Sequence, residues 1–204
     1  TNSMLGTLDL RCNLMTDDGV TSVARSLEEN TNLRELYIGD NKFGLAGATA
    51  LAQALERNCS LLTLDIGGCD LSKKASCEHL AEGIKKNESL LELNVSRCKM
   101  VDEGLHLFVE AVEVNMCLEK VIYHCNLCSS KLLAVMEYAI SRERKPAAVL
   151  LDNMEFNRLA KRKEIQAREE EELLASAENE KANKDKKNAE KMATLEPGVL
   201  IWVP

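Results

Sequence analysis

The side chains best suited to chemistry in this sequence lie together at His124-Cys125-Asn126-Leu127-Cys128. Two cysteines separated by two residues have the spacing of a zinc-ligand pair or of a thiol–disulfide redox motif. Structural zinc sites are almost always four-coordinate, and no second C-x-x-C pair or paired histidine follows this cluster. We therefore expect no metal site here and interpret Cys128 as a structural residue.

The sequence also contains no recognisable set of catalytic residues. The three histidines, His79, His106 and His124, lie in separate parts of the chain, and no Ser or Cys is spaced to form a convincing triad with them. Nothing in the sequence has the pattern of a glycine-rich phosphate-binding loop. We expect a protein that is not an enzyme and that binds no cofactor.

Composition and charge argue against two further classes, nucleic-acid-binding proteins and membrane proteins. The 204 residues carry a net charge of −7, which argues against a general nucleic-acid binder because such a protein needs a basic face. No apolar run approaches the about 20 residues needed to span a bilayer, and no signal peptide is recognisable. We expect a cytoplasmic protein without membrane attachment, whose eight cysteines are thiols.

A five-fold internal repeat organises most of the chain. Blocks of the form L-x-x-L-x-L start at positions that are 28 or 29 residues apart, namely Leu5, Leu33, Leu61, Leu90 and Leu118. The ninth position of each block is Asn or Cys: Asn13, Asn41, Cys69, Cys98 and Asn126. Alternation within each block predicts a short strand with two inward side chains, and the ninth side chain is expected to satisfy buried backbone groups.

Each predicted strand is followed by a predicted helix. In the first repeat Val20, Val23, Ala24 and Leu27 form an i, i+3, i+4, i+7 stripe, and the pattern recurs in every copy, although the fifth copy has Glu137 in one of the four slots. An Asn lies three residues before each following block, at Asn30, Asn58, Asn87 and Asn115. Because Asn tolerates the left-handed conformation, we expect these residues to end the helices in that conformation.

The pattern L-x-x-L-x-L-x-x-(N/C)-x-L with a full helix per repeat resembles the ribonuclease-inhibitor-like subfamily of leucine-rich repeats. Tropomodulin's repeat domain, the Ran GTPase-activating protein and the NOD-like receptor repeats belong to the same class. The resemblance covers about residues 2–145 and implies an α/β solenoid of five repeats, with parallel strands on the concave face and helices on the convex face. It implies no particular function, because proteins of this class share an architecture and little else.

The start of the chain has the register of a missing repeat. Asn2 precedes Leu5 by three residues, as the other asparagines precede their blocks, but no helix comes before it. This predicts that further repeats precede residue 1. It also predicts that the apolar flank formed by Leu8, Leu10, Val20 and Leu27 is open, since solenoids need caps at their ends.

Outward positions of the predicted strands form the candidate binding surface. Acidic residues dominate it beside one aromatic ring, with cations towards the two ends. The candidate partner-binding residues are Asp9, Arg11, Glu35, Tyr37, Asp65, Glu92, Asn94, Lys120, Ile122 and His124. Aromatic and charged residues on such a face favour a protein partner with a basic surface. The alternative is that these positions are polar only because they are exposed. Gly39 and Gly67 also weaken the interpretation as a binding surface, because they contribute no side chain to contact a partner.

The end of the chain is organised differently. We expect a leucine-rich repeat domain over residues 1–151, closed by the apolar segment 147–151, and a long charged helix over residues 152–192. Ten basic and ten acidic residues lie between Asn153 and Met192, so that this segment is neutral although half of it is charged. An apolar tail at residues 193–204 contains Leu200, Ile201 and Trp202 and predicts a short docking segment. The alternative is that this tail does not belong to the natural protein.

These features favour a protein–protein interaction scaffold that binds its partner through the concave face and the C-terminal helix. A cytoskeletal or axonemal component, located on the cytoskeleton or in a cilium, is the first alternative. A regulator of a small GTPase is the second. Self-association through the open first repeat or the C-terminal tail is also expected, because both expose apolar surface.

Overall fold

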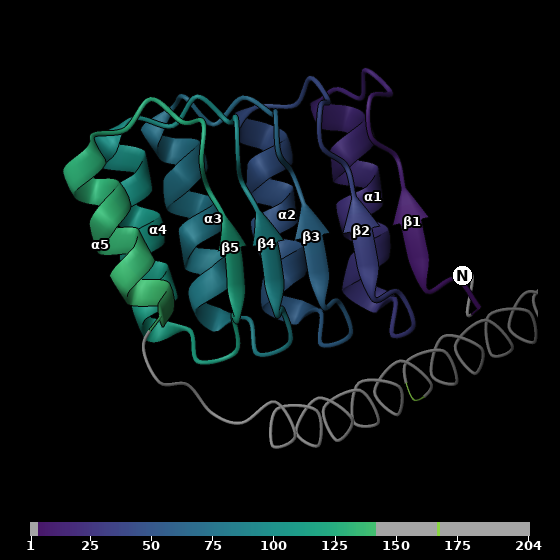
Figure 1. Cartoon of the computed structure of the whole chain (residues 1–204). Helices are drawn as coiled ribbons and strands as arrows, with labels where there is room; N and C mark the ends of the chain where they lie inside the picture. Colours follow the sequence, from purple (N-terminus) through teal and green to yellow (C-terminus); the bar gives the residue numbers. More distant parts are fainter. Residues whose placement is uncertain (1–3, 142–166, 168–204) are drawn as a thin grey trace, which may run out of the picture. The chain divides into compact units, whose positions relative to one another are not determined.

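The computed structural model describes residues 4–141 and residue 167, and these residues form five strand–helix units in sequence (Figure 1). The strands are β1 (Thr7–Asp9), β2 (Glu35–Tyr37), β3 (Thr63–Asp65), β4 (Glu92–Asn94) and β5 (Lys120–Ile122). The helices are α1 (Asp17–Glu29), α2 (Leu45–Arg57), α3 (Lys74–Lys86), α4 (Asp102–Val114) and α5 (Ser130–Ser141). The five predicted repeats and their order are confirmed.

The strands form one parallel sheet in the order β1-β2-β3-β4-β5. Its register joins equivalent positions of successive repeats, so that Leu8 is opposite Leu36 and Leu36 is opposite Leu64. The helices form a second layer on one side of the sheet (Figure 1). Each repeat therefore contacts its neighbours through the same positions, which is the arrangement of a solenoid.

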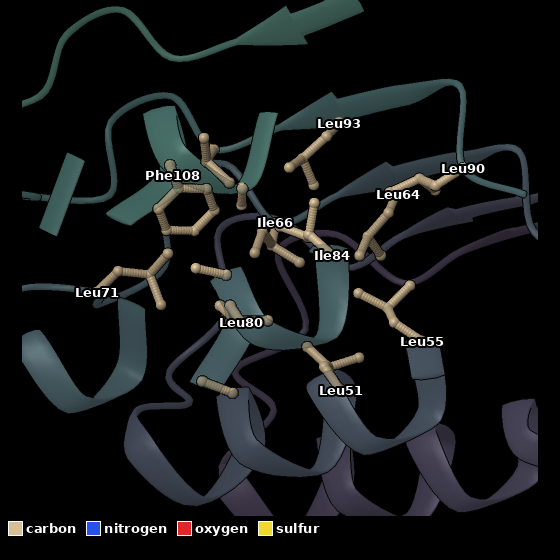
Figure 2. Close-up of a cluster of buried hydrophobic side chains, with 14 of the residues drawn as sticks. Leu51, Leu55, Leu64, Ile66, Leu71, Leu80, Ile84, Leu90, Leu93 and Phe108 are labelled. Atoms are coloured by element: carbon tan, nitrogen blue, oxygen red, sulfur yellow. The ribbon is translucent and has the colours of Figure 1, made fainter. Parts of the chain in front are cut away.

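The core lies between the sheet and the helices and is built from the predicted positions. The central strand residues Leu36, Leu64 and Leu93 are at most 1% exposed. In Figure 2, Leu64 and Leu93 lie in one cluster with the helix residues Leu51 and Ile84, which are also buried. Apolar side chains repeated at a spacing of one unit thus produce a continuous core of nearly constant thickness.

A left-handed residue lies three positions after the end of each strand. Positive φ angles occur at one equivalent position in all five repeats: Cys12, Asp40, Gly68, Arg97 and Cys125. Only the third repeat places glycine there, and a Cβ atom at Gly68 would collide with the carboxylate of Asp40. The other four side chains therefore project from the loops in a conformation that costs free energy.

The backbone conformation predicted for the asparagines that end the helices is wrong. Asn30, Asn58, Asn87 and Asn115 have φ between −79° and −69° and extended ψ, and are not left-handed. The side-chain oxygen instead accepts the backbone N–H groups two and three residues later, as at Asn58 with Ser60 and Leu61. The turn that leaves the helix is therefore held by a side chain, and a left-handed residue is not needed.

The open flank at the first repeat is smaller than predicted. Val20 and Leu27 are at most 2% exposed, because α1 packs against α2 and the sheet. Leu8 and Leu10 are half-buried, while Leu5 is 40% exposed and Leu14 is 65% exposed. The open flank is thus made by Leu5, Leu8 and Leu10 together with Leu14, and Val20 and Leu27 do not belong to it.

Several predictions concern residues outside the described ones. The closing segment 147–151, the charged helix 152–192 and the tail with Leu200, Ile201 and Trp202 all fall there, apart from residue 167. Among the described residues, no helix is long and apolar enough to cross a membrane.

Candidate protein-binding surface

The ten predicted partner-binding residues lie on one surface, which we call the strand face. Asp9, Glu35, Tyr37, Asp65, Glu92, Asn94, Lys120 and Ile122 are on the strands, and Arg11 and His124 follow β1 and β5 directly. The parallel register arranges them in two rows across the sheet. One row contains Asp9, Tyr37, Asp65, Asn94 and Ile122, and the other contains Glu35, Glu92 and Lys120.

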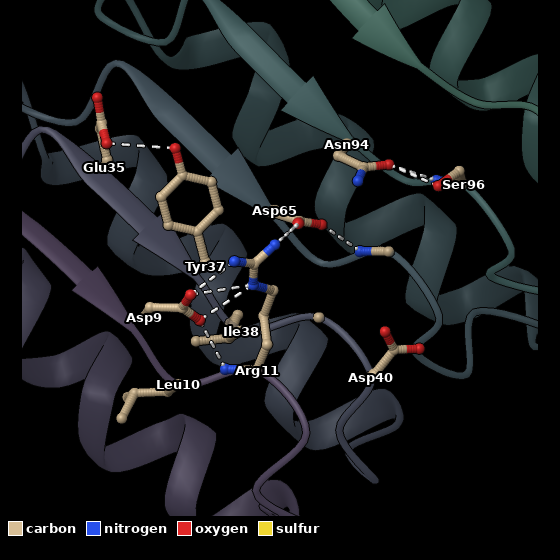
Figure 3. Close-up of polar contacts among 12 residues, drawn as sticks. Asp9, Leu10, Arg11, Glu35, Tyr37, Ile38, Asp40, Asp65, Asn94 and Ser96 are labelled. Atoms are coloured by element: carbon tan, nitrogen blue, oxygen red, sulfur yellow. Dashed lines mark hydrogen bonds and ion pairs between the residues drawn. The ribbon is translucent and has the colours of Figure 1, made fainter.

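Arg11 is the centre of the strand face at its β1 end. Its Nη2 lies 2.6 Å from Asp9 Oδ2, and its Nε donates to Asp9 Oδ1 at 3.0 Å. The guanidinium lies over the Tyr37 ring, 5.0 Å from the ring centroid, and its Nη1 is 4.0 Å from Asp65 Oδ2 (Figure 3). Hydrogen bonds from Arg11 lower the pKa of Asp9, and the same bonds raise the pKa of Arg11. One cation therefore joins three successive strands.

Gly39 makes this reach possible. It lies between Arg11 and Gly67 in the row of positions that follows the strands, and it is buried. A Cβ atom at Gly39 would come within 2.7 Å of Gly67 O and 3.2 Å of Asp65 Oδ1. The carboxylate of Asp65 also accepts the Gly67 N–H at 2.9 Å. Gly39 and Gly67 are therefore covered by neighbouring side chains, although they contribute no side chain of their own to the surface.

Tyr37 is held by a hydrogen bond of its hydroxyl as well as by Arg11 over its ring. Its hydroxyl donates to Glu35 Oε2 at 3.2 Å, and the Thr7 hydroxyl donates to the same oxygen at 3.1 Å. Burial and then the hydrogen bond to Glu35 raise the pKa of Tyr37 above its ordinary value. Among the described residues, no lysine, arginine or histidine forms an ion pair with Glu35. Glu35 is thus the strand-face carboxylate without a cation.

The β5 end of the strand face forms a separate group. Lys120 Nζ lies 3.1 Å from Glu92 Oε2, and Asn94 accepts hydrogen bonds from the backbone and hydroxyl of Ser96. Ile122 is half-buried and His124 is exposed. The predicted residues are therefore brought together as two groups, with Arg11 and Tyr37 in one and Lys120 and Glu92 in the other.

A second polar region, which the sequence analysis missed, lies along the loops that follow the strands. Arg97 pairs with Asp40 at 3.1 Å, and Lys99 pairs with Asp70 at 3.4 Å. Asp40, Asp70 and Lys99 border a hollow of about 590 Å³ that Lys73 also lines. The signal was available, since Asp40 and Arg97 occupy equivalent positions in different repeats and carry opposite charges.

Several of the thiols are packed in the core. Cys69, Cys77 and Cys98 are buried, and burial raises their pKa to about 11, about 11 and about 12. Cys98 Sγ donates to Ile66 O of the preceding repeat at 3.2 Å, as Asn41 Nδ2 in the equivalent slot donates to Leu10 O. Within the part of the chain that the structure describes, no three His, Cys, Asp or Glu side chains gather into a possible metal site.

Comparison with known proteins agrees with this geometry. The leucine-rich repeat family model matches residues 1–24, 29–52, 57–74 and 86–108. A structure of leiomodin-1 actin-binding site 2 superimposes with a TM-score of 0.62 at 15% identity, covering 80% of this chain and 91% of that one. The tropomodulin C-terminal domain of Caenorhabditis elegans superimposes with a TM-score of 0.59 at 14% identity, covering 78% and 92%. No curated protein sequence matches the chain.

Proposed function

We propose that this chain, which matches the leucine-rich repeat family model in four segments and folds as a solenoid of five repeats, is a protein–protein interaction scaffold without catalytic activity. It would bind a protein partner through the strand face. The charged segment 152–192 is the second proposed contact region. The site of action proposed for this scaffold is the cytoplasm.

The arrangement of Arg11 over Tyr37 carries this proposal. Arginine and tyrosine are enriched among the residues that dominate binding energy at protein interfaces. Here Asp9 fixes the guanidinium through three side-chain contacts, and Glu35 accepts the hydrogen bond of the tyrosine hydroxyl. Side chains that are held before a partner arrives lose less entropy when it binds.

The charges of the strand face favour a partner with a basic surface. Its carboxylates are Asp9, Glu35, Asp65 and Glu92, while its permanent cations are Arg11 and Lys120 only. The carboxylate of Glu35 lies next to the Tyr37 hydroxyl, and no cation of residues 4–141 forms an ion pair with it. A basic side chain of the partner placed there would complete the pairing without displacing Arg11.

Differential capture from a cell extract tests the proposal. The wild-type chain is compared with Tyr37→Ala and with Gln53→Ala, which changes an exposed residue of α2 on the helical side. We expect one or more proteins to be captured by the wild type and by Gln53→Ala but lost with Tyr37→Ala. Equal capture by all three proteins would mean that the strand face is not the binding surface.

A cytoskeletal role is the second proposal, and the similarity to leiomodin-1 supports it. That protein's matching region is named as an actin-binding site, although at 15% identity the likeness concerns the fold. Sedimentation of purified actin filaments with the wild-type chain tests this role directly. Enrichment in the pellet that Tyr37→Ala removes would support it, and a chain that stays in the supernatant at all filament concentrations would rule out direct binding to actin filaments.

A further inference from the structure

The first residue of one helix caps the start of the next helix at two places in the repeat region. Asp17, the first residue of α1, accepts hydrogen bonds through Oδ1 from Gly44 N at 2.8 Å and from Gly47 N at 2.7 Å, at the start of α2. Asp102, the first residue of α4, accepts the Ser129 N–H at 2.6 Å, directly before α5. A carboxylate from the preceding repeat thus satisfies N–H groups at the positive end of a helix dipole.

The start of α3 has no such carboxylate. The residue equivalent to Asp17 in the repeat before α3 is Leu45, the first residue of α2, and its side chain has no oxygen. The first turn of α3 contains no acidic residue, and the helix begins with Lys73 at the N-cap and Lys74 in the first position. The Lys73 N–H has no hydrogen-bond acceptor among residues 4–141.

This start differs from those of the other described helices. α1 and α4 have acidic residues in their own first turns, and α2 and α5 are capped by Asp17 and Asp102. Lysines at the start of a helix are unfavourable, because the dipole favours anions there. Departures from such a local preference are expected at functional sites, and α3 therefore lacks an anion that its neighbours have.

A buried hydroxyl lies at the same place. Ser76, the third residue of α3, is the equivalent of Gly47 in α2. A Cβ atom at Gly47 would lie 3.0 Å from Asp17 Oδ1, so the Ser76 side chain leaves the backbone beside the position of the missing carboxylate. Ser76 is fully buried, and in the part of the chain that the structure describes its Oγ is the one buried side-chain oxygen or nitrogen without a hydrogen-bond partner. Buried polar groups are nearly always hydrogen-bonded, so this hydroxyl indicates an acceptor at the start of α3.

The hollow of about 590 Å³ on the loops gives access to this place. Its lining includes the N-cap residues of both helices, Gly44 and Lys73, and α2 and α3 are neighbours in the helical layer (Figure 1). A volume of this size accommodates a side chain together with part of its peptide. A ligand in the hollow would therefore reach the start of α3.

The charges in the hollow leave two lysines without a carboxylate. The acidic side chains that line it are already engaged, namely Asp17 with the start of α2, Asp40 with Arg97 and Asp70 with Lys99. Lys42 and Lys73 also line the hollow, and neither forms an ion pair with a carboxylate of residues 4–141. Two lysines and the positive end of a helix together match the charge of a phosphate monoester, which is close to −2 at neutral pH.

We propose that this place, which we call the α3 cap site, binds the phosphate group of a phosphorylated side chain in a protein partner. The phosphate oxygens would accept the Lys73 N–H and the Ser76 hydroxyl, and they would lie beside the ammonium groups of Lys42 and Lys73. The peptide that carries the phosphate would lie in the hollow. The start of a helix suits a phosphate because its N–H groups and its dipole both favour an anion. The α3 cap site lies on the loops, so its test is independent of any partner on the strand face.

Titration of the full chain with short peptides, followed by proton–nitrogen NMR, tests the proposal. The peptides are identical except for a central phosphoserine, glutamate or serine, and inorganic phosphate is a fourth probe. The phosphoserine peptide should bind most tightly and should shift the amide signals of Lys73 and Ser76. Inorganic phosphate lacks the peptide and glutamate has the smaller charge, so both should bind at least about five-fold more weakly. The serine peptide should cause no shift at these residues.

Leu45→Asp is the most informative variant, because it places a carboxylate where Asp17 lies in the repeat before. The new carboxylate should occupy the α3 cap site from within the chain and weaken binding of the phosphoserine peptide at least about ten-fold. Leu45→Asn, of similar size but without the charge, should weaken it less. Lys73→Gln and Ser76→Ala should also weaken it. Lys131→Gln, the matched control near the start of α5 where a carboxylate is already present, should bind like the wild type.

Three outcomes would overturn the proposal. Wild-type affinity in a folded Leu45→Asp protein would show that the phosphate does not bind at the start of α3. If Leu45→Asp does not fold, unchanged affinity in both Lys73→Gln and Ser76→Ala would lead to the same conclusion. Equal affinity of inorganic phosphate and the phosphoserine peptide would show that the site takes a free ion and not a phosphorylated side chain. An absence of shifts at Lys73 and Ser76 with every probe would show that there is no anion site.

Discussion

The side-chain amide of Asn58 donates to the backbone carbonyl of Asn30 at 2.9 Å, one repeat earlier in the chain. Asn87 repeats this bond to Asn58 O at 3.1 Å, and Asn115 repeats it to Asn87 O at 2.8 Å. Each of the three amides also donates to a carbonyl near the end of the preceding helix. The helix ends are therefore joined by a row of buried asparagines, so that one side chain both ends its own helix and fixes the neighbouring one.

Replacing a member of this row should be costly. In Asn87→Ala the carbonyls of Leu55 and Asn58 and the N–H groups of Ser89 and Leu90 lose their partner while remaining buried. We expect a loss of about 1–3 kcal/mol in the free energy of unfolding, measured by urea denaturation. Glu88→Ala, at the exposed neighbouring position, should change it by less than about 0.5 kcal/mol. Equal losses would show that the row does not stabilise the repeats.

The asparagine slot after the strands gives a second stability prediction. Asn41 is buried and makes five hydrogen bonds to backbone groups, whereas Asn13 in the same slot is exposed and donates one. Asn41→Leu should lower the free energy of unfolding by about 1–3 kcal/mol because those groups lose their partner. Asn13→Leu should lower it far less. A similar cost at both positions, seen in parallel urea titrations, would mean that burial of the slot does not matter.

The periodic core could be predicted from the sequence. Side-chain contacts between residues of different repeats could not. Leu36 and Leu64 could be assigned to the core because the repeat spacing places equivalent residues side by side. Arg11 was assigned only to the end of a row, since its contact with Asp65 crosses a whole strand and depends on the absence of a side chain at Gly39. The asparagines that end the helices were interpreted from local conformational preference, and their bonds to the preceding repeat decided the outcome instead.

Two helical glycines should respond in opposite directions to the same substitution. A Cβ atom at Gly83 would lie 2.6 Å from Ala52 O and 2.8 Å from Ala52 Cα, because α3 approaches the backbone of α2 there. Gly83→Ala should therefore destabilise the protein, although alanine favours a helix by about 1 kcal/mol. At Gly19 the nearest atom is Met15 Cβ at 3.5 Å, which is an ordinary contact. Gly19→Ala should raise the thermal unfolding temperature, and a rise for both variants would contradict the close approach of α2 and α3.

Buried thiols predict how stability changes in alkaline solution. The pKa of Cys98 is raised by burial from an ordinary value of 9.0 to about 12, so the folded protein holds this proton more tightly than the unfolded chain does. Its contribution to stability is complete below pH 9 and is lost as pH rises towards 12. The free energy of unfolding should decline over this range, and the decline should be shallower in Cys98→Ala than in Cys12→Ala. Identical slopes for the two variants would show that the Cys98 thiol does not contribute.

The strand face is the central claim, and the affinity of a partner for defined variants tests it most directly. Isothermal titration should compare the wild type with Tyr37→Ala, Arg11→Lys and Gln53→Ala, using actin or a protein whose capture depends on Tyr37. Tyr37→Ala should weaken binding by at least about 2 kcal/mol, which is roughly 30-fold in Kd. Arg11→Lys should also weaken it, because lysine cannot reproduce the planar contacts with Asp9 and the Tyr37 ring. Wild-type affinity in Gln53→Ala together with these two losses is the predicted result, and unchanged Kd values in Tyr37→Ala and Arg11→Lys would contradict the account.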